Sequence, residues 1–525
     1  MSTLTLVIVR RDCPSLLLYL MSDHQRRAHI ELDVTAGRAR AGMVPDDDTP
    51  FRILVLGDFS GDRSRAGASH APLAARRPIA VDRDTVDDVI AQIAPEILLE
   101  RGADGDVIVR IASIDDFHPD QLYDALPLFK SLRTMRARLA DPATFASAAR
   151  ELAASDLTGE TGQSAAPSPP RPAPGHVLDA ILGEPAPAAE PSEDALQQLI
   201  RRAIEPYLVA AADPRQDALL ARVDRAMTNA MRGVLHTRAF QAVEAAWRSV
   251  WMLTRRLETD EHLEIQLLDV SAAELVADLG PDVPPQESDL WRIIAEGSVE
   301  QPGAQPWSLL VGAFTFGWDD ADLAVLSRLG MIARRAGAPV VAGAAPRLAG
   351  MPAFDAASDA SAWSANPIDA WEALRASPEA AYIGLAAPRF LARLPYGADG
   401  EECDRFAFEE LGETFDHREF LWANAAFACA ALLGQSFSAG GWRMRPGSRR
   451  ELTALPFVLL RRNGEVQAKP CAEVLLTERA SNRLLDCGIM PLASLKDQDA
   501  ALLVRLQSIA HPVTALAGRW QAAQP

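Results

Sequence analysis

The sequence lacks the motifs of the common enzyme and metal-site classes. Its five cysteines form no CxxC pair; they are Cys13, Cys403, Cys429, Cys471 and Cys487. Its nine histidines form no HExxH pattern, and no GxSxG, Walker or protein-kinase motif is present. An odd, dispersed set of cysteines is typical of reduced intracellular thiols, which predicts a cytoplasmic protein. We therefore expect no enzymatic activity, no catalytic residue, no cofactor and no metal ion.

Positive charge and long apolar runs are also scarce. The chain has 52 lysines and arginines against 71 aspartates and glutamates, a formal net charge of −19. Phosphate surfaces attract basic proteins, so this balance argues against a nucleic-acid partner. No apolar run approaches the roughly 20 residues needed to cross a bilayer, which predicts no direct membrane insertion. The 525 residues, 48% of them apolar, predict two or three domains with sizeable cores.

The first 29 residues form a predicted N-terminal extension. Arg10, Arg11 and Asp12 interrupt its apolar run, and Met21 offers a second start. The extension is either a mis-annotated start or an authentic extra strand. From Ile30 an alternating segment follows, which is either a free strand that adds to another subunit's sheet or a leader.

A proline- and alanine-rich linker divides the chain. Residues 158–175 are rich in Pro, Ala, Gly and Ser, and a shorter Pro/Ala stretch covers 184–191. We therefore predict domains at 30–150 and 192–525, joined by a linker at 151–191. Between the two stretches, an apolar face predicts a short helix at 177–184; its residues are Val177, Leu178, Ile181 and Leu182. A helix this short is marginal in water and needs a partner surface, either its own domain or another protein.

The most informative stretch is the predicted helix at 232–257. Phe240, Val243, Trp247 and Val250 recur at intervals of three and four, which predicts one buried face. Glu244 and Arg248 are expected to pair on the opposite side. The string LHTRAFQAVEAAWRSVWML closely resembles the early helix of the large sheath subunit of type VI secretion systems, the TssC (VipB) family. The matching residues are Leu235, His236, Phe240, Glu244, Trp247 and Arg248, and Ser249 replaces the usual glycine.

A second stretch resembles the small sheath subunit, TssB (VipA). A predicted buried strand at 51–56 is followed by Gly57, Asp58, Phe59 and Ser60, and later by Arg76-Arg77-Pro78. Asp58 would repel a phosphate, so a nucleotide loop is disfavoured. We expect a helix at 86–100, then a strand at 106–113, then a helix after Phe117-His118-Pro119. The acids around His118 fit helix-capping chemistry better than a metal site.

A third stretch, at 382–397, also resembles the large subunit. The matching residues are Leu385, Pro388, Arg389, Phe390, Leu391, Arg393, Leu394, Pro395, Tyr396 and Gly397. Arg389 and Arg393 lie among apolar neighbours and need acidic partners, for which Glu409 and Glu410 are the expected source. Residues 307–346 alternate strand, helix and strand, which predicts parallel pairing. Ala313 stands in this region where the family has an aspartate.

Together these patterns predict an α/β fold: two mixed α/β domains, joined by the Pro/Ala-rich linker and packed intimately as a sheath-protomer-like unit. The first domain is small-subunit-like, and the second is a C-terminally shortened large-subunit-like domain. The resemblance implies a structural sheath subunit that polymerises around an inner tube and drives effector delivery by contraction. Its implied partners are other copies, the inner-tube and baseplate proteins, and the AAA+ unfoldase ClpV at helix 177–184. The alternative is a non-polymerising accessory or capping protein, or a decayed relic.

Overall fold

The computed structural model describes residues 5–8, 17–21, 28–31, 45–61, 71–99, 106–154, 213–297, 305–351, 353–354, 363, 369–398, 400–412, 415–462 and 465–520. The chain forms two compact units. The larger unit contains Met1–Ala125 and Met231–Pro525, and the smaller contains Leu126–Ala230. The larger unit therefore combines segments from both predicted halves.

The smaller unit is helical where it is described. It contains α4 (Pro127–Ala140), α5 (Phe145–Ala154) and most of α7 (Gln216–Leu235). The Arg136 guanidinium donates to Asp224 over 2.7 Å, and the Gln216 amide donates to the carbonyl of Leu139 over 2.8 Å. These bonds join α4 to α7 within the unit.

The larger unit is built on a mixed sheet, which has nine strands among the described residues, in the order β14-β18-β17-β11-β10-β9-β4-β8-β5. The strands are β14 (Glu451–Leu452), β18 (Ala501–Leu503), β17 (Ile489–Ser494), β11 (Ile383–Ala387), β10 (Val340–Ala344), β9 (Leu309–Phe316), β4 (Phe51–Gly57), β8 (Leu263–Asp269) and β5 (Ile79–Ala80). Neighbours from β17 to β8 are parallel, and the outer pairs are antiparallel. The predicted α/β fold and the parallel pairing of β9 with β10 are confirmed.

Strand β4 lies inside this sheet, although it comes from the N-terminal part of the chain. It pairs with β8 from Phe51 opposite Leu263 to Gly57 opposite Asp269, and with β9 along its other edge. Strands β8 and β9 follow one another among the strands of the C-terminal part, and β4 fills the position between them. Because both faces of the sheet are covered, β4 is apolar along most of its length.

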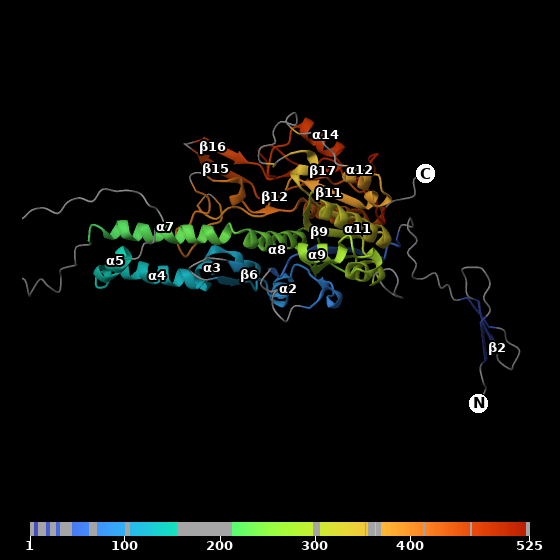
Figure 1. Cartoon of the computed structure of the whole chain (residues 1–525), viewed down its shortest axis with the longest axis horizontal. Helices are drawn as coiled ribbons and strands as arrows, with labels where there is room; N and C mark the ends of the chain where they lie inside the picture. The colour runs from blue at the N-terminus through green and yellow to red at the C-terminus, as the bar shows by residue number, and fades with distance from the viewer. Residues whose placement is uncertain are drawn as a thin grey trace, which may run out of the picture. The chain divides into compact units, whose positions relative to one another are not determined.

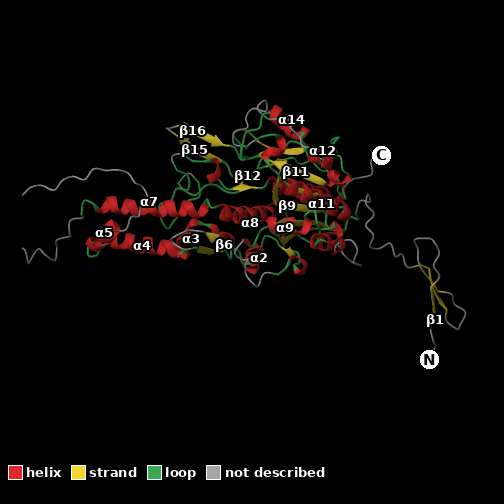
Figure 2. Cartoon of the chain, in the orientation of Figure 1, coloured by secondary structure: helices red, strands yellow, loops and turns green. Residues whose placement is uncertain are grey.

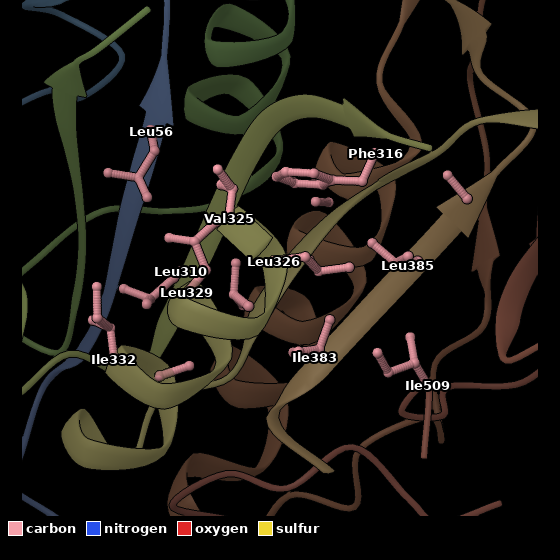
Figure 3. Packing of buried hydrophobic residues seen from close by; sticks show 14 of the residues in the cluster. Leu56, Leu310, Phe316, Val325, Leu326, Leu329, Ile332, Ile383, Leu385 and Ile509 are labelled. Atoms are coloured by element: carbon pink, nitrogen blue, oxygen red, sulfur yellow. The ribbon is translucent and has the colours of Figure 1, made fainter. Parts of the chain in front are cut away.

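Helices cover both faces of the sheet. Helix α11 (Asp320–Ala336), with α9 (Ala272–Leu279) against it, packs on one face, and Figure 2 shows α11 beside β9 and β11. Leu54 and Leu56 of β4 belong to that layer, where Figure 3 shows Val325 and Leu326 of α11 lying between Leu56 and Leu385. Alternate residues of β4 point to the other face, where Phe51 stacks on Phe437 of α13 (Ala425–Gly440). Helix α8 (Arg238–Arg256) packs against α13.

The remaining described elements are shorter; Figure 1 shows their order along the chain. They are β1 (Thr5–Ile8), β2 (Leu17–Met21) and β3 (Ala28–Glu31), which form a separate antiparallel sheet, then α2 (Val86–Ile93), α3 (Pro119–Ala125), a π-helical turn (Trp291–Glu296), α12 (Asp369–Arg375), the pair β12 (Phe390–Leu391) and β13 (Trp422–Ala423), the hairpin β15 (Val458–Arg462) and β16 (Glu465–Lys469), and α14 (Glu478–Asp486).

The prediction of one helix at 86–100 is right for its first half and wrong for its second half. It ends at Ile93, because Ala94 adopts a left-handed conformation at φ 52° and Pro95 follows. Residues Glu96–Leu99 instead form strand β6, which pairs antiparallel with β7 (Val107–Arg110). Two features of the sequence indicate this break: Pro95, and the apolar alternation of the EILL segment that follows it.

Candidate functional site

The candidate site is an internal interface, which we call the seam: the contacts that residues 51–125 make with residues 231–520 within the larger unit. Its first part follows β4. Asp269, at the end of β8, accepts hydrogen bonds through Oδ1 from the backbone of Phe59 (2.8 Å) and Ser60 (3.1 Å). Its Oδ2 accepts from the Ser60 hydroxyl over 2.8 Å. A residue of the large-subunit-like part thus holds the Gly-Asp-Phe-Ser turn.

Two glycines of this turn are required by space and backbone geometry. A Cβ on Gly57 would lie 2.9 Å from the Cβ of Ala313. Gly61 has φ +76°, and a Cβ there would lie 2.8 Å from the carbonyl oxygen of Glu96. Between them, the Asp58 carboxylate accepts from the Gly61 backbone over 2.9 Å. Asp58 therefore shapes the turn.

Helix α8 supplies the apolar part of the seam. The Trp247 indole N–H donates to the Phe59 carbonyl over 2.9 Å, and the two rings lie 5.2 Å apart. Seven residues earlier, on the same face of α8, the ring of Phe240 packs edge-on against the ring of Phe117, with centroids 5.7 Å apart. All four side chains are fully buried. The heptad spacing of Phe240 and Trp247 therefore serves contact with the small-subunit-like segment.

A buried ionic network lies beside this apolar part. The Arg393 guanidinium donates to Glu244 over 2.8 Å and to both oxygens of Glu410 over 2.7 and 2.9 Å. Glu244 also accepts from Arg248 over 2.7 Å. Two carboxylates thus meet two guanidinium groups, so no charge in this buried group is left uncompensated. The predicted Glu244–Arg248 pair exists, but its placement opposite the buried face was wrong, because Glu244 is fully buried.

The network fixes the charge state of Glu410. Burial alone would raise the pKa of this carboxyl, but the charge of Arg393 and the hydrogen bonds from Arg393 and the Tyr396 backbone lower it to about 2. The Tyr396 hydroxyl accepts from Arg248 over 2.8 Å, and burial raises the pKa of this phenol. His236 Nε2 lies 3.6 Å from Glu410, too far for a hydrogen bond, and has no such partner among the described residues.

The network also reaches the small-subunit-like segment. His118 meets the edge of the Tyr396 ring at 4.9 Å. Two residues on, the Asp120 carboxylate accepts from the backbone of Asp404 (2.9 Å) and Arg405 (3.0 Å). His118 and its neighbouring acid therefore contribute to the seam.

The prediction that Glu409 and Glu410 pair with Arg389 and Arg393 is right for one arginine and wrong for the other. Arg393 binds Glu410 as predicted, but Arg389 pairs with Glu473, which accepts from its backbone over 2.9 Å and from its guanidinium. His417 Nε2 lies 3.0 Å from the same carboxylate. Burial would raise the Glu473 pKa, but the His417 hydrogen bond and the Arg389 charge hold it at about 2.

The rest of this signature shapes a turn. The bond before Pro388 is cis, and Phe390 begins β12. The Pro395 carbonyl accepts from the Glu401 backbone over 3.2 Å. Gly397 has φ +138°, and a Cβ there would lie 2.2 Å from the Glu409 carboxylate, so glycine is required. Glu409 therefore lies against Gly397, where its carboxylate accepts from the backbone of Ala398 over 3.1 Å.

Sequence reasoning missed four residues that hold the seam or its surroundings. Asp269 and Glu274 each contact the small-subunit-like segment, the latter through Arg76, while Glu473 and His417 support Arg389. Asp269 is the last residue of β8 and Glu274 belongs to the Ser271 capping box, so each looks purely local in sequence. Their partners lie some 200 positions away, beyond the reach of any local pattern.

The proposed unfoldase-binding residues, Val177, Leu178, Ile181 and Leu182, lie outside the described residues. Of the helices that the structure describes, none combines the length and apolar character needed to span a bilayer.

Comparison with known proteins matches the two sides of the seam to two families. Residues 217–510 match the VipB tail sheath N-terminal domain, and residues 21–154 match the type VI secretion system VipA family. The chain is 31% identical over 337 residues to the type VI secretion system sheath protein TssC1 of Pseudomonas aeruginosa, an alignment covering 62% of this chain and 68% of the relative. The VipA match contains β4, and the VipB match contains the strands on either side of it. The chain therefore belongs to the type VI secretion system sheath family and is a structural sheath subunit with VipA-like and VipB-like parts in one polypeptide.

Proposed function

We propose that this chain acts as a whole sheath protomer, which polymerises with other copies around an inner tube and drives effector delivery when the polymer contracts. The observation that carries the proposal is the interior position of β4, paired on both edges by strands of the VipB-like part. A strand buried in this way supports a unit that moves as one body. Joining the parts covalently also raises their effective concentration for each other and fixes their ratio.

The seam suits a mechanical role. Its aromatic contacts are buried, and Asp269 holds the turn after β4 across it. The buried ionic network lies beside these contacts, within the VipB-like part. Opening the seam would return these fully buried aromatic side chains to water, at a cost of about 1.5–3 kcal/mol for each, so the interface resists partial opening. Contraction would then proceed by rearrangement between protomers, with the seam intact within each. No nucleotide chemistry is needed in such a sheath.

Electron microscopy of the purified full chain tests the proposal. We expect helical tubes that form from this polypeptide alone. A chain that stays as single particles at every concentration tested, or that binds only the ends of preformed sheaths, would contradict polymerisation and favour the capping role.

The proposed partners extend beyond other copies. We propose that the protein works in the cytoplasm with inner-tube and baseplate proteins, and that residues 177–184 bind the N-terminal domain of the AAA+ unfoldase. The sequence supports this, because Val177, Leu178, Ile181 and Leu182 are spaced as one apolar face of a predicted short helix, and such a helix needs a partner surface.

The docking segment is tested with a 175–186 peptide against the unfoldase N-domain, measured by fluorescence anisotropy. We expect saturable binding, which an Ile181→Asp peptide of equal length loses. Absence of binding by the native peptide, or equal binding by both, would refute the assignment.

A further inference from the structure

A groove beside the C-terminal half of α8 has the properties of a docking site. Its volume is about 330 Å³, and it lies between the last turns of α8, strand β12 and the loop at 454–456. Its lining is largely apolar and includes Trp251, Met252, Phe390 and Leu455. We call it the arginine groove, because Arg248, Arg255 and Arg256 also line it.

The charges of this groove are unbalanced. The Arg248 guanidinium already donates hydrogen bonds to Glu244 and to the Tyr396 hydroxyl. Arg256 donates to the carbonyl of Ala454 over 2.8 Å, and Arg255 lies over the Trp251 ring at 4.8 Å. Within the described part of the chain, no carboxylate lies within ion-pair distance of Arg255 or Arg256, and no acidic residue lines the groove. Burial accordingly lowers the pKa of Arg256, with no acidic neighbour to offset it.

The lining of this groove is opposite in sign to the chain as a whole. The chain carries a net charge of −19, whereas the charged side chains that line the groove are all arginines. A guanidinium that is half removed from water gains most from a carboxylate that completes its hydrogen bonds. The apolar lining adds room for a large apolar side chain next to that carboxylate.

We propose that the arginine groove binds an acidic, apolar-containing segment of a second copy of this chain. Charge complementarity selects this occupant, because another copy is strongly acidic and the groove is not. The inference rests on the proposed function in that the partner is another protomer, and it assigns one surface of that assembly to named residues.

The test compares two charge-reversed full-length variants. Arg255→Glu with Arg256→Glu removes the positive charge of the groove. Arg449→Glu with Arg450→Glu makes the same change in net charge at an exposed pair outside it. We expect the groove variant to fold normally and to need at least about tenfold more protein for tube formation, measured by sedimentation, while the control matches the wild type.

A photo-crosslinking residue at Met252 separates this inference from the proposed function. We expect covalent dimers of the purified chain, with the crosslink mapped to an acidic segment. If no variant forms tubes but these dimers appear and disappear on groove charge reversal, the groove assignment stands and the sheath proposal fails. If tubes form equally well in both variants, or no crosslinked dimer of the purified chain appears, the groove assignment is overturned.

Discussion

Replacing Arg393 by methionine isolates the contribution of the buried network. The side chain is 6% exposed and neutralises Glu410 while sharing Glu244 with Arg248. Without it, Glu244 keeps one arginine, and Glu410 becomes a buried carboxylate with no guanidinium partner, held by the Tyr396 backbone N–H over 2.8 Å. Breaking a buried pair in this way costs about 3–5 kcal/mol. Since about 1.4 kcal/mol is a factor of ten, the unfolding equilibrium should shift by roughly two to three and a half orders of magnitude.

The loss of unfolding free energy caused by Arg393→Met should also depend on pH, and it should be smaller in acid. In the wild type the pKa of Glu410 is about 2, because Arg393 outweighs the effect of burial. In the variant the charge and hydrogen bonds of Arg393 are gone, while burial and the Tyr396 backbone hydrogen bond remain, so the pKa of Glu410 rises and protonation relieves the unpaired charge. The difference in unfolding free energy between the two proteins should therefore be largest near neutral pH and shrink as the pH falls.

Urea unfolding followed by tryptophan fluorescence measures this difference, since Trp247 lies in the seam. The control is Arg418→Met, which breaks an exposed pair with Asp416 and should leave the unfolding curve unchanged. A loss below about 1 kcal/mol for Arg393→Met at pH 7, or a loss that grows on acidification, would refute the reasoning.

Three further predictions concern the same unit. Asp269→Ala removes the acceptor for two backbone N–H groups and should cost about 1–3 kcal/mol in urea unfolding, more than Asp269→Asn, whose amide oxygen can still accept. Gly343→Ala places a Cβ 2.7 Å from the side-chain nitrogen of Asn424 and should lower the free energy of unfolding by about 1–3 kcal/mol. Gly233→Ala is the matched control: its Cβ would meet no neighbouring group within 4 Å, so the melting temperature should stay unchanged or rise. Glu410 and Glu473 have folded pKa values of about 2 against an ordinary value of 4.5, so their stabilisation is complete above pH 4.5 and is lost as the pH falls toward 2. Glu473→Gln should flatten that part of the acid-unfolding curve, and an unchanged curve would contradict the assignment.

Much of the fold follows from local pattern. The apolar run at 51–56 predicts a buried strand, and the strand–helix–strand alternation at 307–346 predicts parallel pairing; both are present. The apolar spacing of Phe240 and Trp247 also predicts a central helix, as observed. Hydrophobic periodicity does not predict the order of strands in the sheet. Nothing in the local sequence places β4 between β8 and β9, because that pairing joins residues more than 200 positions apart.

The polar residues of the site show the same limit. Arginines at 389 and 393 predict acidic partners, because buried guanidinium groups need them. Proximity in sequence identifies Glu410 correctly but fails for Arg389, whose partner Glu473 is 84 positions away. Glu244 was misplaced because a charged residue in an amphipathic helix is usually solvated. Its burial is favourable because both Arg248 and Arg393 donate to its carboxylate, and Arg393 comes from a distant part of the chain.

The most direct test of the central claim is amide hydrogen exchange along β4 in the full chain, read by mass spectrometry. If residues 53–56 form an interior strand between β8 and β9, their amides should exchange only through global unfolding and be among the slowest in the protein. Exchange of these amides as fast as that of the exposed hairpin β15–β16 would contradict the shared sheet and the single-chain protomer that depends on it.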